Sequence, residues 1–201
     1  SLTARVNALE NAGRSAAGAQ AVAVAYVMAL GQWQSALASG HPFALELETT
    51  KAIAVRAGAA IDDSAFAGYA ATGIPTLPDL RGRFDAAAAA AVRAAAVPDD
   101  TAGWLRRVLD RIMSLATIRR IDGAAEGSSA WAIAARAESR MALNDLAGAV
   151  AEMEALRGPA AEAAASWTGP AKARLAAERT LGDATTKAIA AVAAAADKPS
   201  N

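Results

Sequence analysis

Side chains suited to acid–base, nucleophilic or metal chemistry are scarce in this sequence. It has no cysteine and a single histidine, His41, which stands between Gly40 and Pro42. A transition-metal site needs several nitrogen or sulfur ligands, and this residue set cannot supply them. The acidic pairs Asp62-Asp63 and Asp99-Asp100 precede expected helices, where carboxylates serve as caps. The sequence therefore predicts that the protein is not an enzyme and holds no cofactor or metal, and it assigns His41 a capping or exposed role.

Binding at a lipid surface is the chemistry that residues 104–120 could perform. Apolar side chains recur there at helical spacing, as Trp104, Leu105, Val108, Leu109, Ile112, Leu115 and Ala116. The arginines lie off that stripe, as Arg106, Arg107, Arg111, Arg119 and Arg120, and Asp110 alone opposes them. A basic amphipathic helix with a terminal tryptophan is typical of helices that lie in a bilayer interface. Each arginine near anionic lipid contributes about 1 kcal/mol.

The same segment has a second interpretation. Any helix docked on a bundle shows one apolar stripe and a charged, solvated face, and the pattern alone favours this explanation. The chain would then be a soluble adaptor in which the helix pair between Ser129 and Leu156 grips a partner peptide. That pair has the form of one tetratricopeptide-like unit, although no second copy follows at a matching period. The residues alone leave both interpretations open.

Composition predicts the fold class. Twenty basic and 20 acidic residues give zero net charge over 201 residues, so no strong field favours nucleic acid. Hydrophobic residues reach 54% while aromatic residues reach only 4%, and alanine dominates the sequence. Alanine is the best helix former, whereas strands prefer branched and aromatic residues. We therefore expect an all-α protein folded as a helical bundle.

The first 40 residues predict a long helix. Apolar residues recur every seven positions, as Leu2, Leu9, Ala16, Ala23, Leu30 and Leu37. This heptad stripe is typical of the end of a coiled-coil stalk, although Gly13 and Gly18 predict a break. The apolar run over residues 21–30 has about half the length that a membrane span needs, so we expect it to be a buried helix segment.

The remaining elements follow from caps and helix breakers. Helices are expected over residues 43–57, 62–69, 80–97, 102–120, 129–143, 146–156 and 160–196, with a loop over 72–78 and a kink at Gly169-Pro170. We expect a stalk over residues 1–40, a helical domain over 41–196 and a disordered tail over 197–201. Trp33, Trp131 and Trp167 are expected to anchor the core, because a tryptophan buries far more apolar area than an alanine. Arg81 and Arg83 are expected to be surface residues.

The last third of the chain resembles the C-terminal domain of the mitofilin family. The correspondence covers roughly residues 129–181 and extends more loosely upstream, where the 104–120 segment stands at the place of the family's membrane-associating amphipathic helix. Matching motifs are Arg136-Ala137, Asp145-Leu146, Ala149-Val150, Leu156-Arg157-Gly158, Trp167, Ala171-Lys172 and Leu175. The earlier stretch from Ile74 to Phe84 resembles the alphaproteobacterial branch. The chain departs from the pattern at Asn144, where the family has glycine, and at Gly169-Pro170.

The resemblance implies a membrane-organising protein of the bacterial inner membrane whose domain faces the periplasm. It implies an anionic phospholipid membrane as one partner, self-association into a homo-oligomer, and contact with an outer-membrane assembly protein of the Omp85 type. It also makes the membrane interpretation of residues 104–120 the favoured one. The predicted membrane-binding residues are Trp104, Leu105, Arg106, Arg107, Val108, Leu109, Arg111 and Ile112. The family's transmembrane helix and most of its coiled coil are absent from these residues.

Overall fold

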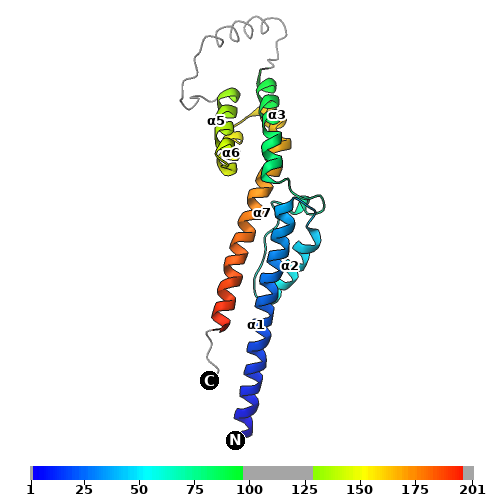
Figure 1. Cartoon of the computed structure of the whole chain (residues 1–201), viewed down its shortest axis with the longest axis vertical. Coiled ribbons are helices and arrows are strands. Elements are labelled where there is room, and N and C mark those ends of the chain that lie inside the picture. The colour runs from blue at the N-terminus through cyan, green and yellow to red at the C-terminus, as the bar shows by residue number, and fades with distance from the viewer. Residues whose placement is uncertain (1, 97–128, 197–201) are drawn as a thin grey trace, which may run out of the picture. The chain divides into compact units, whose positions relative to one another are not determined.

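The computed structural model describes residues 2–96 and 129–196, and these residues form helices joined by turns and loops (Figure 1). The helices are α1 (Leu2–Ser39), α2 (Ala44–Arg56), the 3-10 helix η1 (Ala67–Tyr69), α3 (Leu77–Ala95), α5 (Ala130–Ala142), α6 (Leu146–Met153) and α7 (Gly158–Ala196). The described part of the chain contains no strand, so the predicted all-α class is confirmed. Two compact units divide the chain: residues 1–76 with 172–201, and residues 77–171.

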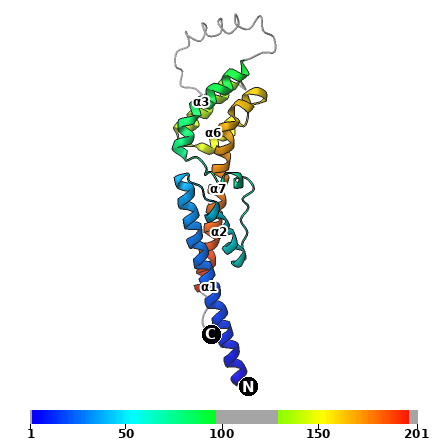
Figure 2. The same ribbon diagram turned by 90° about the vertical axis from the view of Figure 1, so that its right-hand side faces the viewer.

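Unit 1 consists of α1, α2, η1 and the part of α7 from Lys172 onward. Its core surrounds Trp33, which is fully buried and stacks on Phe66 at a centroid distance of 5.8 Å. Thr50 of α2 is also buried, and its hydroxyl donates to the carbonyls of Glu46 and Ala29. This last bond joins α2 to α1, and the two helices lie side by side in both views (Figures 1 and 2).

Close backbone packing in unit 1 requires two glycines. Gly40 and Gly73 have φ angles of +73° and +86°, values that glycine adopts without strain. A Cβ atom on Gly73 would collide with the carbonyl oxygen of Gly40. Nearby, the amide of Phe43 donates to the carbonyl of Ala70 at 2.8 Å. The loop after η1 is therefore fastened directly to the turn between α1 and α2.

Unit 2 contains α3, α5, α6 and the first part of α7. Trp167 is buried, meets Phe84 edge to face at 5.1 Å, and donates its indole N–H to the carbonyl of Leu80 at 2.8 Å. Alanines fill much of the remaining interface, including Ala91, Ala137 and Ala149, which are inaccessible to solvent. Small side chains let the helices approach closely, so the two aromatic rings supply most of the bulk.

The structure corrects one predicted helix break and one predicted helix start. The helix α1 continues through Gly13 and Gly18, because each glycine costs only about 1 kcal/mol relative to alanine. The helix α3 begins at Leu77 rather than at residue 80, because Pro78 falls in the first turn, where its missing N–H is no loss. The helix α7 also continues through Pro170, and the kink predicted there stays a prediction.

The expected helix over residues 62–69 is reduced to the three residues of η1. Asp62 does accept a backbone hydrogen bond from Ser64, as its predicted capping role requires, but that bond closes a turn. The helix α6 ends at Met153, three residues earlier than expected. The helix α7 begins at Gly158, and Pro159 is its second residue. Proline is tolerated in the first turn of a helix, where its missing N–H is no loss. The Gly158-Pro159 pair predicted to break a helix therefore starts α7.

Trp131 is not a core residue. Its side chain is 60% exposed, whereas Trp33 and Trp167 are buried as predicted. Trp131 lies in the first turn of α5, and the apolar face of that helix is formed by Ile133, Ala137 and Met141. Amino-acid type alone could not show that Trp131 falls off this face.

Candidate functional site

The predicted membrane-binding residues lie outside the described part of the chain. They are Trp104, Leu105, Arg106, Arg107, Val108, Leu109, Arg111 and Ile112, and they fall within residues 97–128. The helix α3 ends before that segment, and α5 begins after it with Ser129 as its N-cap. The Ser129 hydroxyl accepts from the amide of Ala132 at 3.2 Å, as its predicted capping role requires.

The helix α1 presents a second apolar surface, which faces away from the core of unit 1. Tyr26, Leu30, Trp33 and Leu37 point inward and are buried. On the opposite side lies the outer face of α1, defined here by Val6, Ala17, Ala21, Val24 and Met28, all of which are exposed. Met28 is 65% exposed, and the residues from Ala17 to Met28 border an open hollow of about 520 Å³.

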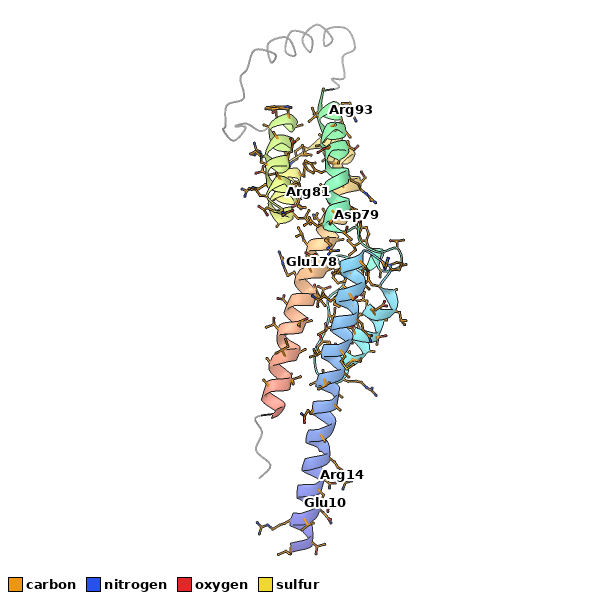
Figure 3. All side chains as sticks on the ribbon, in the orientation of Figure 1. Glu10, Arg14, Asp79, Arg81, Arg93 and Glu178 are labelled. Carbon is orange, nitrogen blue, oxygen red and sulfur yellow. The ribbon has the colours of Figure 1, made fainter. Side chains whose placement is uncertain are left out.

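The outer face of α1 carries little charge. Between Arg14 and Glu46 the sequence has no Asp, Glu, Lys or Arg. Glu10 and Arg14, labelled in Figure 3, form an exposed ion pair at 3.8 Å near the start of the helix. Because exposed helix faces are normally charged, a long neutral face of this kind is typical of a surface that another molecule covers.

The predicted heptad stripe divides between the interior and the surface of unit 1. Ala23, Leu30 and Leu37 are buried against their own chain, whereas Leu2 is 81% exposed. Residues Gly13–Ser39 are long and apolar enough to cross a membrane, and only 33% of the most apolar 18-residue window within them is buried. The burial predicted for residues 21–30 holds only on one side of the helix: Ala23, Tyr26, Ala29 and Leu30 are buried, whereas Val24 and Met28 are exposed. The apolar stretch is also longer than the ten residues predicted.

The helix pair α5–α6 carries the motif residues of the predicted resemblance, and they act in folding. Asn144 adopts φ +60°, the left-handed conformation that glycine and asparagine favour. Asp145 caps α6 by accepting from the amide of Gly148 at 2.8 Å, and it pairs with Arg140 at 3.2 Å. Arg136 and Glu152 join the two helices through a 2.7 Å bond. These contacts fix a helix hairpin and leave no catalytic arrangement in it.

Arginines close the ends of two helices. Arg81 of α3, expected only as a surface residue, donates to the carbonyls of Met141 and Ala142 at the end of α5. Arg174 of α7 is buried and donates to the carbonyl of Leu37 at the end of α1, at 2.7 Å. Sequence reasoning missed both roles, because the bonded partners are 60 and 137 residues away along the chain.

Catalytic or metal-binding groups do not converge in the described ranges. No group of three His, Asp or Glu side chains there is placed to hold a metal ion. His41 is exposed, as expected, and its Nδ1 atom lies 3.1 Å from the hydroxyl of Ser39 at the end of α1.

Comparison with known proteins identifies the family. The family model described as "Mitofilin: Mitochondrial inner membrane protein" matches residues 1–182. The chain belongs to the mitofilin family. It is also 32% identical over 165 residues to the "Probable magnetosome protein Mms36" of Magnetospirillum gryphiswaldense. That alignment covers 82% of this chain and 46% of the relative, so the chain spans about half the length of that relative. No solved structure shows a significant match.

Family membership confirms the resemblance stated from the residues and extends it to the N-terminus. The match includes α1, α2 and α3 as well as the α5–α6 hairpin. The family is one of membrane-associated proteins, and both names point to a structural protein rather than to an enzyme.

Proposed function

We propose that this mitofilin organises the inner membrane by self-associating and by placing the basic helix of residues 104–120 against anionic phospholipid. The observation that carries the proposal is the family match over residues 1–182. In this proposal the domain faces the periplasm, shapes membrane invaginations, and contacts an Omp85-type outer-membrane assembly protein. The family match does not favour the alternative of a soluble adaptor.

Self-association is assigned to the outer face of α1. A helix face without charge can meet its own copy without repulsion, and two-fold symmetry then pairs each apolar residue with a matching surface. Val24 and Met28 are the large apolar side chains exposed at its centre, with exposed fractions of 44% and 65%. Alanines on either side would allow two helices to approach closely.

The membrane part of the proposal is tested by co-sedimentation with vesicles that contain anionic lipid. Wild-type protein is expected to bind at low salt and to be released as salt screens the arginines. Leu109→Asp, and the double change Arg106→Glu with Arg107→Glu, should each abolish most binding. Binding that both changes leave intact would refute the proposal for this helix.

Matched controls separate the helix from general charge effects. Leu45 is a 76% exposed leucine of α2, so Leu45→Asp repeats the apolar-to-acidic change elsewhere. Arg56→Glu with Arg179→Glu repeats the double charge reversal at exposed residues of unit 1. Leu45→Asp should bind vesicles nearly as the wild type does. Arg56→Glu with Arg179→Glu should lose only the general attraction that follows from its lower positive charge.

The self-association part is tested by light scattering. Wild-type protein should show a mass that is a multiple of 20.2 kDa, and Val24→Glu with Met28→Glu should reduce it to one chain. The control places the same two charges on α2, at Leu45 and Val55, which are 76% and 74% exposed. A monomeric wild type, or an equal response of both pairs, would contradict this assignment.

A further inference from the structure

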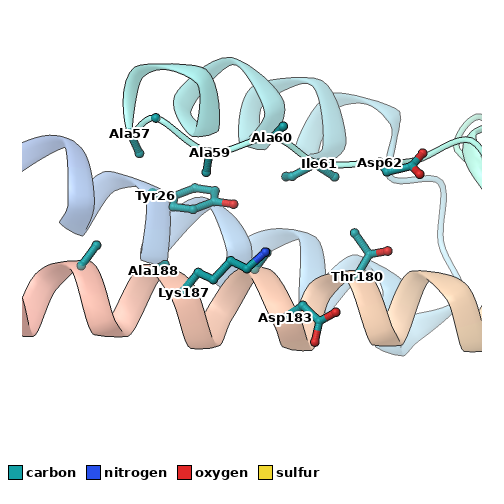
Figure 4. Close-up of a pocket in the computed structure, with 13 residues that line it drawn as sticks. Tyr26, Ala57, Ala59, Ala60, Ile61, Asp62, Thr180, Asp183, Lys187 and Ala188 are labelled. Atoms are coloured by element: carbon teal, nitrogen blue, oxygen red, sulfur yellow. The ribbon is translucent and has the colours of Figure 1, made fainter.

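A cavity in unit 1 has no part in the function proposed above. It lies between the chain segment from Ala57 to Asp62 and the second half of α7, with Tyr26 of α1 at its floor (Figure 4). Its volume is about 560 Å³. Pockets of this size hold small molecules or the head of a larger one.

Tyr26 contributes to this cavity a hydroxyl group that has no hydrogen-bond partner among the described residues. The residue is only 2% exposed. Figure 4 shows that the hydroxyl points along the cavity. Burial raises the pKa of Tyr26, so the hydroxyl stays protonated at neutral pH and can donate. The hydroxyl opens onto the cavity, where a ligand can accept from it.

The other lining groups are ordered along the cavity (Figure 4). One end is apolar and is formed by Ala57, Ala59 and Ala188. Thr180 and the Asp62 carboxylate lie toward the opposite end, and the Lys187 ammonium lies between the two ends. Asp183 also borders the cavity, but its carboxylate points away from the segment from Ala57 to Asp62 (Figure 4).

The charges in the cavity are available to a ligand. Among the described residues, Lys187 and Asp183 form no ion pair. Hydrogen bonds from the side chain and then the amide of Ser64 lower the pKa of Asp62, which keeps this carboxylate anionic. A ligand with only negative charge would meet the Asp62 carboxylate, and one with only positive charge would meet the Lys187 ammonium. Only a ligand that carries both charges satisfies the whole set.

We propose that the cavity binds a zwitterion whose anionic oxygen group contacts Lys187 and Tyr26 and whose ammonium contacts Asp62. An apolar portion attached beyond the anionic group would lie along the alanine end. Ethanolamine phosphates have this order of groups, whether as a phospholipid head or as a free compound. The site lies in unit 1 and uses none of residues 104–120, so it stands or falls independently of the membrane-binding helix.

Calorimetric titration of the whole chain with soluble probes tests the site. Dihexanoyl-phosphatidylethanolamine, below its micelle concentration, carries all three groups, and O-phosphoethanolamine lacks the apolar portion. Dihexanoyl-phosphatidylglycerol has the anionic group and the apolar portion without the ammonium. We expect the ethanolamine lipid to bind at least about tenfold more tightly than the glycerol lipid, because hydrogen-bonded charges are lost with the ammonium.

The two ethanolamine probes distinguish the sources of the ligand. Equal affinity for both would assign a free zwitterion, and tighter binding of the lipid would assign a phospholipid head. Absence of binding by both, or equal binding of the ethanolamine and glycerol lipids, would overturn the proposal.

Conservative variants locate the ligand. Tyr26→Phe removes only the hydroxyl and should weaken binding about three- to tenfold, and Lys187→Met should weaken it about tenfold or more. Asp62→Asn retains an oxygen that can cap Ser64 while it removes the charge, so it should weaken binding of the ethanolamine probes alone. Tyr69→Phe and Arg179→Met repeat two of these changes outside the cavity. Probe affinity unchanged by Tyr26→Phe and Lys187→Met, with circular dichroism showing intact folding, would refute the site.

Discussion

Among the described residues, each unit buries one tryptophan and bonds a helix end to an arginine of another helix, yet the two units bond these side chains differently. In unit 2 the indole of Trp167 donates to Leu80, whereas the indole N–H of Trp33 in unit 1 is buried without a partner among the described residues. The helix-closing arginine of unit 1, Arg174, is 8% exposed, whereas Arg81 of unit 2 is exposed.

The comparison shows where polar groups remain available. The tryptophan of unit 2 has its bond inside the protein, while unit 1 buries an unbonded indole and opens the hydroxyl of Tyr26 onto a cavity. Unit 1 also carries the neutral outer face of α1. A region whose polar and apolar groups are not all paired internally is the one from which binding is expected.

The largest expected effect comes from removing either tryptophan. Trp33→Ala and Trp167→Ala should each lower the free energy of unfolding by about 3–5 kcal/mol, because each leaves a cavity in an alanine-rich core. Urea denaturation followed by circular dichroism measures this. A loss below 1 kcal/mol at one of the two sites would break the parallel between the units.

The two arginines should differ next. Arg174→Met should cost about 2–3 kcal/mol, because a buried charge-assisted bond to Leu37 is lost, along with the 2.6 Å bond to Glu178. Arg81→Met should cost about 1 kcal/mol or less, since its bonds to Met141 and Ala142 lie near solvent. The same denaturation experiment compares them, and equal costs would remove this contrast.

Replacing each tryptophan by phenylalanine tests the indole bonds directly. Trp167→Phe leaves the carbonyl of Leu80 without its partner, whereas Trp33→Phe removes an N–H that had none. We expect Trp167→Phe to be more destabilising by about 1 kcal/mol, since an unmade buried hydrogen bond carries that cost. The urea midpoints of the two variants, measured side by side, show which substitution destabilises the protein more.

The caps of the helices should give a smaller difference. Asp145→Ala should lower stability by about 1 kcal/mol, because α6 loses its side-chain cap to Gly148. Asp145→Asn keeps an acceptor oxygen and should lose less. The N-cap residue of α2 in unit 1 is Phe43, which makes no side-chain cap bond, so the start of that helix offers no equivalent position. Thermal melting of the two variants separates the cap from the charge.

The smallest effect is expected at the exposed tryptophan. Trp131→Ala should change the free energy of unfolding by no more than about 0.5 kcal/mol, because the side chain is 60% exposed. Urea denaturation of Trp131→Ala and Trp33→Ala, measured side by side, compares the same substitution at an exposed and at a buried position. A loss comparable to that of Trp33→Ala would mean that Trp131 is covered in solution.

Local signals predicted the helices better than they predicted burial. Ser129 and Asp145 were identifiable as caps, and Asn144 as a turn residue, because each acts within four residues of its own position. The exposure of Trp131 and the bonds of Arg81 and Arg174 depend on distant segments, which residue type does not reveal. Gly13 and Gly18 were misjudged because a single-residue propensity was weighed without the long alanine-rich helix around it.

The candidate site was predictable only in part. The spacing of residues 104–120 led to the membrane-binding helix, which stays a prediction. The outer face of α1 and the Tyr26 cavity were not anticipated, because both depend on which side of α1 the chain covers. The sequence does carry one signal for the outer face, because no charged residue lies between Arg14 and Glu46.

The way α7 is shared between the units has a consequence for synthesis on the ribosome. Unit 2 is one unbroken stretch, from Leu77 to Ala171, and can fold as soon as that stretch has emerged. Unit 1 includes residues 1–76, which are made before unit 2, but lacks its last helix until Lys172 and the residues after it are translated. The segment made first therefore has to finish second. During that wait the inward surface of α1, including Trp33, is left for a chaperone, a membrane or a neighbouring nascent chain to shield.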